Sequence, residues 1–150
     1  MNRPYGMRSA APGEVRAIAL RLVQLATTMG VVMGLAIFAG AGTLTRIFTA
    51  DAQVLTAAMA VTSIVAFFQP IDAAMLAQEG VLLGARQHAY ISRSVIATSV
   101  VCFCALNALT ATKRPYTLVS VWCCIKILTM GRAIFSGHRL YVSPQSPLLM

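Results

Sequence analysis

The chain contains 150 residues, of which 58% are hydrophobic and 11% are charged, and its formal net charge is +8. Soluble domains average roughly 45–50% apolar and about 25% charged residues, so the composition argues against a soluble domain and for a membrane protein. The basic residues are scattered between long apolar runs. This arrangement is typical of topology signals and argues against nucleic acid as a partner.

The four cysteines lie inside apolar runs, at Cys102, Cys104, Cys123 and Cys124. No histidine lies near them at zinc-ligand spacing, and free cysteine packs like a small hydrophobic residue. We therefore interpret them as apolar helix residues and expect no metal site and no bound cofactor. The sequence also contains no evident nucleophile–base arrangement, so it predicts no catalytic residues and no enzyme.

Four apolar segments are long enough to cross a bilayer, which requires ~20 mostly apolar residues. Strand-like alternation is absent from them. We therefore predict an all-α membrane protein with four antiparallel transmembrane helices, whose first partner is the lipid bilayer. A basic cytoplasmic tail is expected at 1–21 and a second tail at 140–150. The predicted helices cover about 22–44, 53–84, 89–109 and 116–137.

Short connections join the predicted helices, which makes sequential neighbours antiparallel. In the first connection, Thr49 or Asp51 is positioned to cap the second helix. Basic residues favour the cytoplasmic side of a membrane, and eight of them fall on one predicted side against three on the other. Both termini are therefore predicted to lie in the cytoplasm or its equivalent. The eight are Arg3, Arg8, Arg16, Arg21, Arg86, Arg93, Arg132 and Arg139, and the three are Arg46, Lys113 and Arg114.

Glycines four residues apart occur in two predicted helices. GVVMG contains Gly30 and Gly34, and GVLLG contains Gly80 and Gly84. Small residues at this spacing let helices approach each other closely within lipid. We interpret both pairs as helix-packing positions within the chain, in preference to a dimer interface.

The second predicted helix carries two of the chain's four acidic residues, in the segment AFFQPIDAAMLAQEGVLLGA. At 100° per residue, a polar stripe covers about one quarter of the circumference. It consists of Gln69, Asp72, Leu76 and Glu79. A carboxylate at membrane depth costs at least ~2.5 kcal/mol unless it is paired, hydrated, protonated or bound to a cation. Asp72 is therefore predicted to load and release H⁺ or Na⁺, while Glu79 either shares this role or is solvated or paired with a basic residue.

Pro70 lies inside the same predicted helix, where it removes a backbone hydrogen bond and frees the carbonyl near Ala66. In a membrane that carbonyl needs another partner. A kink with a free carbonyl beside Asp72 is a candidate cation cradle and a candidate hinge, and the alternative is a proline that only kinks the helix. The candidate cation-binding residues are thus Asp72, Glu79 and Gln69.

Four pieces of the sequence, in order, are similar to segments of one transporter family. They are GEVRAIALRLVQL, RIFTADAQVL, FQPIDAAMLAQEGVLLGA and VWCCIKILTMGRAIFSGHR, and each lies next to a predicted helix end. From about residue 13 to 139, the chain resembles the C-terminal third of a MATE (multidrug and toxic compound extrusion) transporter. The most similar branch is the DNA-damage-inducible-F-like one, which includes plant citrate and plastid-envelope members.

This resemblance implies twelve helices in two six-helix lobes, which couple H⁺ or Na⁺ entry to the export of drugs, toxins or organic anions. Residues 22–139 would form part of the C-terminal lobe, and helices one to eight would be missing partners, so the fragment would be inactive alone. Asp72 stands where some members carry an acid of the cation site, and Phe68 stands where those members carry a tyrosine. Glu79 matches an acid that the branch carries before a glycine. The implied location is the plasma membrane or an organelle membrane, such as that of a plastid.

Other classes of membrane protein also account for these features. One alternative is a complete four-helix exporter that works as a dimer, like small multidrug resistance proteins, although those rely on an acid in their first helix and this chain has none there. Another is a membrane-anchored assembly subunit or an inert truncated product. Lys126, in the middle of the fourth predicted helix, either pairs with an acid or extends along the helix toward the cytoplasm.

Overall fold

The computed structural model describes residues 12–111, 117–143 and 146. Within these residues the chain forms four α-helices and no strand, and each helix is long and apolar enough to cross a membrane. The predicted all-α membrane class is therefore confirmed. The helices are α1 (Pro12–Phe48), α2 (Ala52–Gly84), α3 (His88–Ala111) and α4 (Leu118–Tyr141).

Two helices are longer than the apolar runs that predicted them. α1 begins at Pro12 rather than near residue 22, and α4 continues to Tyr141 rather than ending near 137. An apolar run marks the part of a helix that lies in lipid, whereas the backbone hydrogen bonds continue into more polar sequence. Proline is favoured at the first helical position, and the charge of Glu14 in the first turn interacts well with the helix dipole. Parts of both predicted tails are thus helical, and residues 1–11 lie outside the described residues.

α2 starts at a side-chain cap. Oδ1 of Asp51 accepts hydrogen bonds from the backbone N–H groups of Gln53 (2.8 Å) and Val54 (3.4 Å). Of the two predicted caps, Asp51 is the one that caps α2, while the hydroxyl of Thr49 accepts a hydrogen bond from the Asp51 N–H. A cap of this kind contributes ~1 kcal/mol, and it sets the start of the helix that carries the acidic residues.

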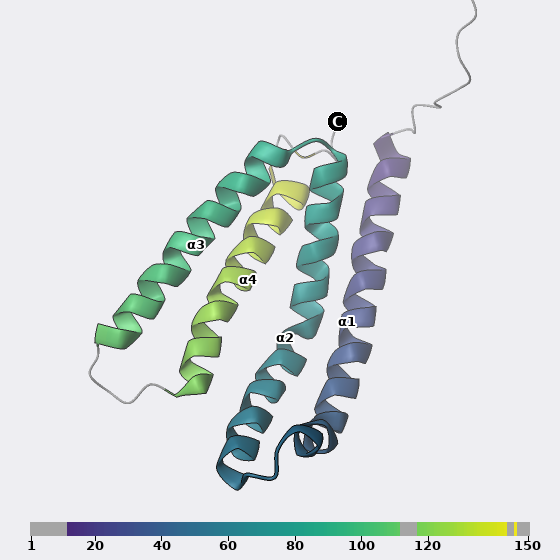
Figure 1. Ribbon diagram of the computed structural model, residues 1–150. Helices are drawn as coiled ribbons and strands as arrows, with labels where there is room; N and C mark the ends of the chain where they lie inside the picture. Colours follow the sequence, from purple (N-terminus) through teal and green to yellow (C-terminus); the bar gives the residue numbers. More distant parts are fainter. Residues whose placement is uncertain (1–11, 112–116, 144–145, 147–150) are drawn as a thin grey trace, which may run out of the picture.

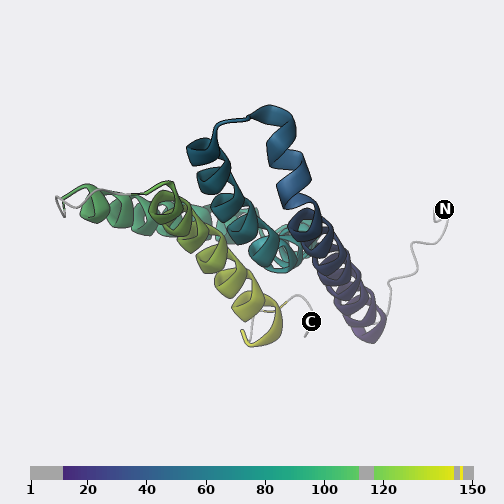
Figure 2. The same cartoon turned by 90° about the horizontal axis from the view of Figure 1, so that it is seen from below.

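The helices lie side by side in the order α1, α2, α4, α3 (Figure 1). α2 packs against α1 on one side and against α4 on the other, while α3 packs mainly against α4. Seen from below, the helices form an open row, and the last part of α1 turns away from the axis of the rest (Figure 2). α2 is therefore the central helix, with a neighbour on each of two faces.

The start of α1, the α2–α3 connection and the end of α4 lie at the same end of the molecule (Figure 1). Among the described residues, the arginines near these points share that end, and Arg46, in the last turn of α1, lies toward the other. This grouping is the one on which the topology prediction depends, and the cytoplasmic location of that end stays a prediction. The arginines at the shared end are Arg16, Arg21, Arg86, Arg93 and Arg139.

Close packing between helices depends on glycine. A Cβ atom at Gly30 would lie 2.7 Å from the Pro70 Cα, and one at Gly34 would lie 2.5 Å from the Ala66 carbonyl oxygen, so α1 and α2 meet backbone to backbone there. A Cβ at Gly131, which the sequence analysis did not single out, would lie 2.5 Å from the Thr98 Cγ2 across the α3–α4 contact. The other predicted packing pair, Gly80 and Gly84, has no such neighbour within 4 Å in the described part of the chain.

Few side chains are fully enclosed. In the described residues, a small apolar cluster of Ala19, Leu82 and Leu140 joins α1, α2 and α4. Many large apolar side chains elsewhere are exposed, among them Phe67 and Ile134. Lipid tails are as apolar as these side chains, so such exposure carries no penalty in a membrane and also suits contact with further helices.

Candidate functional site

The kink of α2 faces α1. Pro70 has no N–H, so the Ala66 carbonyl loses its intrahelical partner, and α2 changes direction near its middle (Figure 1). Gly34 of α1 lies directly against that carbonyl, and Gly30 lies against Pro70. A glycine presents a Cα hydrogen in place of a Cβ, which allows a weak C–H···O contact with the carbonyl oxygen. The freed carbonyl is therefore covered by α1.

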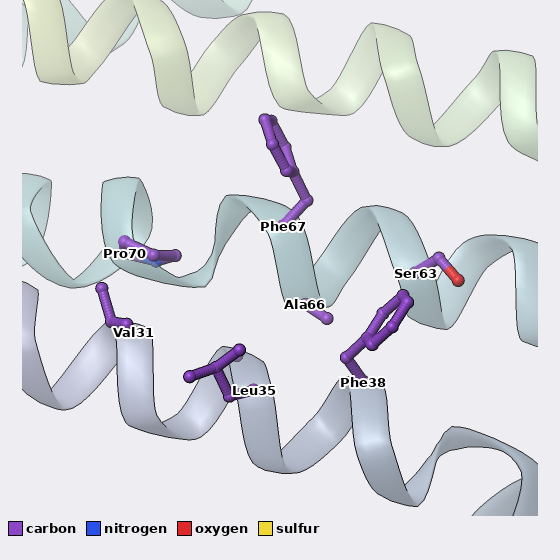
Figure 3. A pocket seen from close by; sticks show the side chains of 8 residues that line it. Val31, Leu35, Phe38, Ser63, Ala66, Phe67 and Pro70 are labelled. Atoms are coloured by element: carbon purple, nitrogen blue, oxygen red, sulfur yellow. The ribbon is translucent and has the colours of Figure 1, made fainter.

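An apolar groove of about 470 Å³ lies along this α1–α2 contact. Figure 3 shows Ala66 and Pro70 on the α2 side of it and Val31 and Leu35 on the α1 side. No charged side chain lines it in the described structure, and the hydroxyl of Ser63 donates to a carbonyl of its own helix. Among the described residues, the groove thus has no carboxylate that could hold a cation.

The acidic residues of α2 face α4, on a different side of the helix. Ala66 and Asp72 are six residues apart, which places them about 120° apart around the axis. The free carbonyl and the carboxylate therefore do not share a site, and the predicted cradle of the two is not formed. Gln69 lies at the α1 edge of the stripe, where its Cβ is 3.5 Å from the Cβ position of Gly34. Leu76, between the two edges, is 62% exposed.

Asp72 forms an ion pair with Lys126 of α4. The distance from the Lys126 Nζ to the Asp72 Oδ2 is 2.6 Å, and the two side chains are 9% and 24% exposed, respectively. The ammonium also lies 5.4 Å from the centre of the Phe68 ring, within the range of a cation–π interaction. Of the two readings of Lys126, the structure shows the pairing with an acid.

This pair lies well inside the membrane-spanning part of α4. Lys126 is eight residues after Leu118, so it lies about 12 Å along the axis from the start of the helix and about 22 Å from its end. The second carboxylate oxygen of Asp72, Oδ1, is buried and has no hydrogen-bond partner in the described structure. Asp72 is therefore neutralised through one oxygen only.

Glu79 forms a second ion pair, with Arg132 of α4. The Arg132 Nε donates to Oε1 at 2.9 Å, and its Nη2 donates to Oε2, so both carboxylate oxygens are held. Such two-pronged arginine–carboxylate pairs are among the stronger polar contacts in proteins. The Glu79 side chain is only 8% exposed. Of the alternatives for Glu79, pairing with a basic residue is the one that the structure shows.

The two ion pairs follow one seam. The acids are seven residues apart on α2 and the bases six apart on α4, close to two helical turns in each case. The residue numbers of the acids and of their bases increase in the same direction, because α2 and α4 run parallel. In the sequence, Arg132 was only a topology signal, and Lys126 had two alternatives, of which pairing with an acid was one. The matching two-turn spacings of acids and bases were the signal that could have paired them.

A polar cluster joins α3 and α4 at the arginine-rich end. The Arg139 Nε donates to the Gln87 Oε1 at 2.7 Å, and the guanidinium lies 4.8 Å from the centre of the Tyr90 ring. The Tyr90 hydroxyl donates to the Phe135 carbonyl at 2.8 Å. These contacts hold the start of α3 against the end of α4, and none of them involves Asp72.

Comparison with known proteins identifies the family. The MatE family model matches residues 9–112, which include α1, α2 and α3. The acids Asp72 and Glu79 lie inside the matched region, and their partners on α4 lie beyond it. No curated protein and no solved structure matches the chain. Because the match covers more than half of the chain and the helices can span a membrane, the protein is an integral multi-pass membrane protein that belongs to the MatE family of transporters.

Proposed function

We propose that the chain forms the C-terminal part of a cation-coupled antiporter, in which H⁺ or Na⁺ entry drives the export of drugs, toxins or organic anions. The observation that carries the proposal is the Asp72–Lys126 ion pair within the spanning helices of a MatE-family chain. Ionisable residues at membrane depth are costly and commonly mark ion pathways and proton relays. The four sequence pieces support this proposal, because they resemble the last four of twelve helices in the DNA-damage-inducible-F-like branch.

Asp72 is the proposed coupling residue. A proton or cation that reaches its carboxylate would neutralise it and so compete with Lys126 for it. The ion pair that joins α2 to α4 at mid-membrane would then weaken. Cation binding would thereby be linked to the distance between two helices, which is the kind of discrete rearrangement on which alternating access depends.

Glu79 and Gln69 complete the proposed coupling set, and we assign them different roles. Arg132 holds both oxygens of Glu79, so this acid would take up a cation only after the pair opens. Gln69 lies on the α1 side of the stripe, next to Gly34 and the Pro70 kink. We assign it to the Pro70 kink within α2, where a change at Asp72 would be passed along the helix.

The partners of this chain are proposed to be the other helices of the same transporter. α1 and α3 lie at the two edges of an open row, and both expose large apolar side chains such as Leu35 and Phe103. These faces suit contact with further helices as well as with lipid. The chain alone would then be inactive, and transport would require helices one to eight.

A reconstitution experiment tests the function. The 150-residue chain and the longest reading frame that contains it are each placed in liposomes, and efflux of a fluorescent organic cation is followed under an H⁺ or Na⁺ gradient. Gradient-driven efflux is expected with the longer product and not with the chain alone. Absence of gradient-driven efflux of this dye and of a labelled organic anion from both would contradict the proposal.

The role of Asp72 is tested in the active product with Asp72→Asn. Loss of gradient dependence is expected, since an amide neither loads nor releases a proton. The matched control is Asp51→Asn, which makes the same change in the same helix at an exposed cap where asparagine works as well as aspartate. Unchanged coupling in Asp72→Asn would remove Asp72 from the mechanism.

A further inference from the structure

Lys126 occupies the space beside Asp72 that a bound cation would need. Its ammonium contacts one carboxylate oxygen at 2.6 Å and lies over the Phe68 ring, and the lysine is buried. We propose that the Lys126 ammonium is the resident cation of this site and that it excludes alkali-metal cations such as Na⁺ from Asp72. The inference bears on coupling only if the proposed function holds, but binding at Asp72 can be measured without transport.

The surroundings of Asp72 suit an ammonium group better than a bare metal ion. Transporter sites for alkali cations draw on backbone carbonyls at broken helices. Here the carbonyl freed by Pro70 lies against Gly34 on the other side of α2, so it is not available beside the carboxylate. What lies there instead is an aromatic ring, whose face attracts an ammonium group.

The Lys126 ammonium can also be displaced, by a proton that neutralises the Asp72 carboxylate. Its contact with Asp72 uses one carboxylate oxygen, and the other has no partner in the described residues. In the neighbouring pair, the arginine holds both oxygens of Glu79 and leaves no position open. Lysine is a point charge on a flexible stem, whereas the arginine fork is planar and pre-organised. Of the two ion pairs, that of Asp72 is therefore the one built to open.

Removal of the lysine charge should expose the site to Na⁺. In Lys126→Met the partly buried carboxylate keeps both oxygens and loses its counter-ion, so a small cation with attendant water takes its place. Binding of radioactive sodium to the purified full chain in lipid nanodiscs measures this, in alkaline buffer so that protons compete less. Bound sodium at a fixed low concentration should rise about tenfold over the wild type.

Three further variants make the result specific. Lys126→Arg keeps the charge and should bind no more sodium than the wild type. The double variant Lys126→Met with Asp72→Asn should lose the gain, because the acid is gone. Lys126→Gln keeps a neutral hydrogen-bond donor, and it replaces Lys126→Met if that variant loses its helical circular dichroism spectrum.

Two outcomes would overturn the inference: no gain in sodium binding over the wild type in either neutral variant, or a gain that survives Asp72→Asn. Because these measurements involve no transport, they remain separable from the efflux assay. Sodium binding as expected with no efflux would remove the proposed function alone. Efflux with no gain in sodium binding would remove only the role of Lys126.

Discussion

The two neighbours of α2 contact it in opposite ways. α1 approaches through Gly30 and Gly34, with backbone against backbone, and no charged side chain among the described residues lines the groove beside them. α4 also packs directly against α2, and two ion pairs join the two helices across that contact. Close steric packing has one good arrangement, whereas an ion pair can open and re-form. We therefore expect α1 and α2 to move as one unit and motion, where it occurs, to lie between α2 and α4.

A similar contrast holds within the α2–α4 seam. Glu79 is held by both oxygens, and Asp72 by one. Asp72 is also the more exposed of the two acids, at 24% against 8% for the side chains. We therefore expect the Glu79 pair to act as a clasp that opens less readily and the Asp72 pair to act as the exchangeable one.

The largest expected effect is that of Glu79→Ala. It leaves the Arg132 guanidinium without its partner, and removal of one member of a buried pair typically costs about 3–5 kcal/mol. The midpoint of detergent-induced unfolding of the purified chain measures this loss. As a control, Glu14→Ala removes an exposed acid from the first turn of α1 and should change stability by only about 0.5 kcal/mol.

Replacement of both Glu79 and Arg132 tests whether the contact between them needs its charges. Glu79→Leu with Arg132→Met puts apolar side chains of similar size at the contact, and such replacements are often neutral or stabilising by about 1–4 kcal/mol. The double variant should therefore recover most of the stability lost in Glu79→Ala. If it unfolds as readily as the single variant, then shape at this point matters more than charge balance.

A smaller loss is expected for Lys126→Met. The Asp72 carboxylate that remains is partly accessible and can take up a proton or a cation, so its isolation should cost about 1–3 kcal/mol. The same unfolding measurement applies, with and without added sodium. A loss greater than that of Glu79→Ala would reverse the order of the two pairs and undo the contrast between clasp and exchangeable site.

The α1–α2 contact is tested by Gly34→Ala, for which the added Cβ would lie 2.5 Å from the Ala66 carbonyl oxygen. Overpacking of this kind typically costs about 1–3 kcal/mol, and we expect the lower part of that range because one methyl group is added. Gly80→Ala is the matched control, since a Cβ there meets nothing within 4 Å and alanine is favoured in helices by roughly 0.5–1 kcal/mol. Equal unfolding midpoints for the two variants would show that the α1–α2 contact tolerates separation.

Much of the fold follows from local sequence. Long apolar runs predict helices that span a membrane, and each run is a helix in the structure. Helix ends were predicted less well, because the apolar run records contact with lipid and not the extent of backbone hydrogen bonding. α2 was predicted almost to the residue, since Asp51 marks its start by a cap that depends on nearby atoms alone.

The candidate site was predicted in part. Spacing along one helix places Asp72 and Glu79 on a shared face, because helical periodicity is a property of the chain itself. Nearness in sequence suggested that the Ala66 carbonyl lies beside Asp72, which the structure does not support, since α1 covers that carbonyl from another side. Which basic residue neutralises which acid depends on how α4 is placed against α2.

The sequence alone was sufficient to identify a four-helix membrane protein with two acids on one face of a spanning helix, because hydropathy and helical period act over neighbouring residues. Only the packing of the helices decided three contacts. They are the pairing of Asp72 with Lys126, the two-pronged contact of Arg132 with Glu79, and the position of Gly34 against the kink. Each joins residues more than thirty positions apart, and no local rule sets the register and rotation of one helix against another. In lipid, those are set by the close contacts and ion pairs themselves.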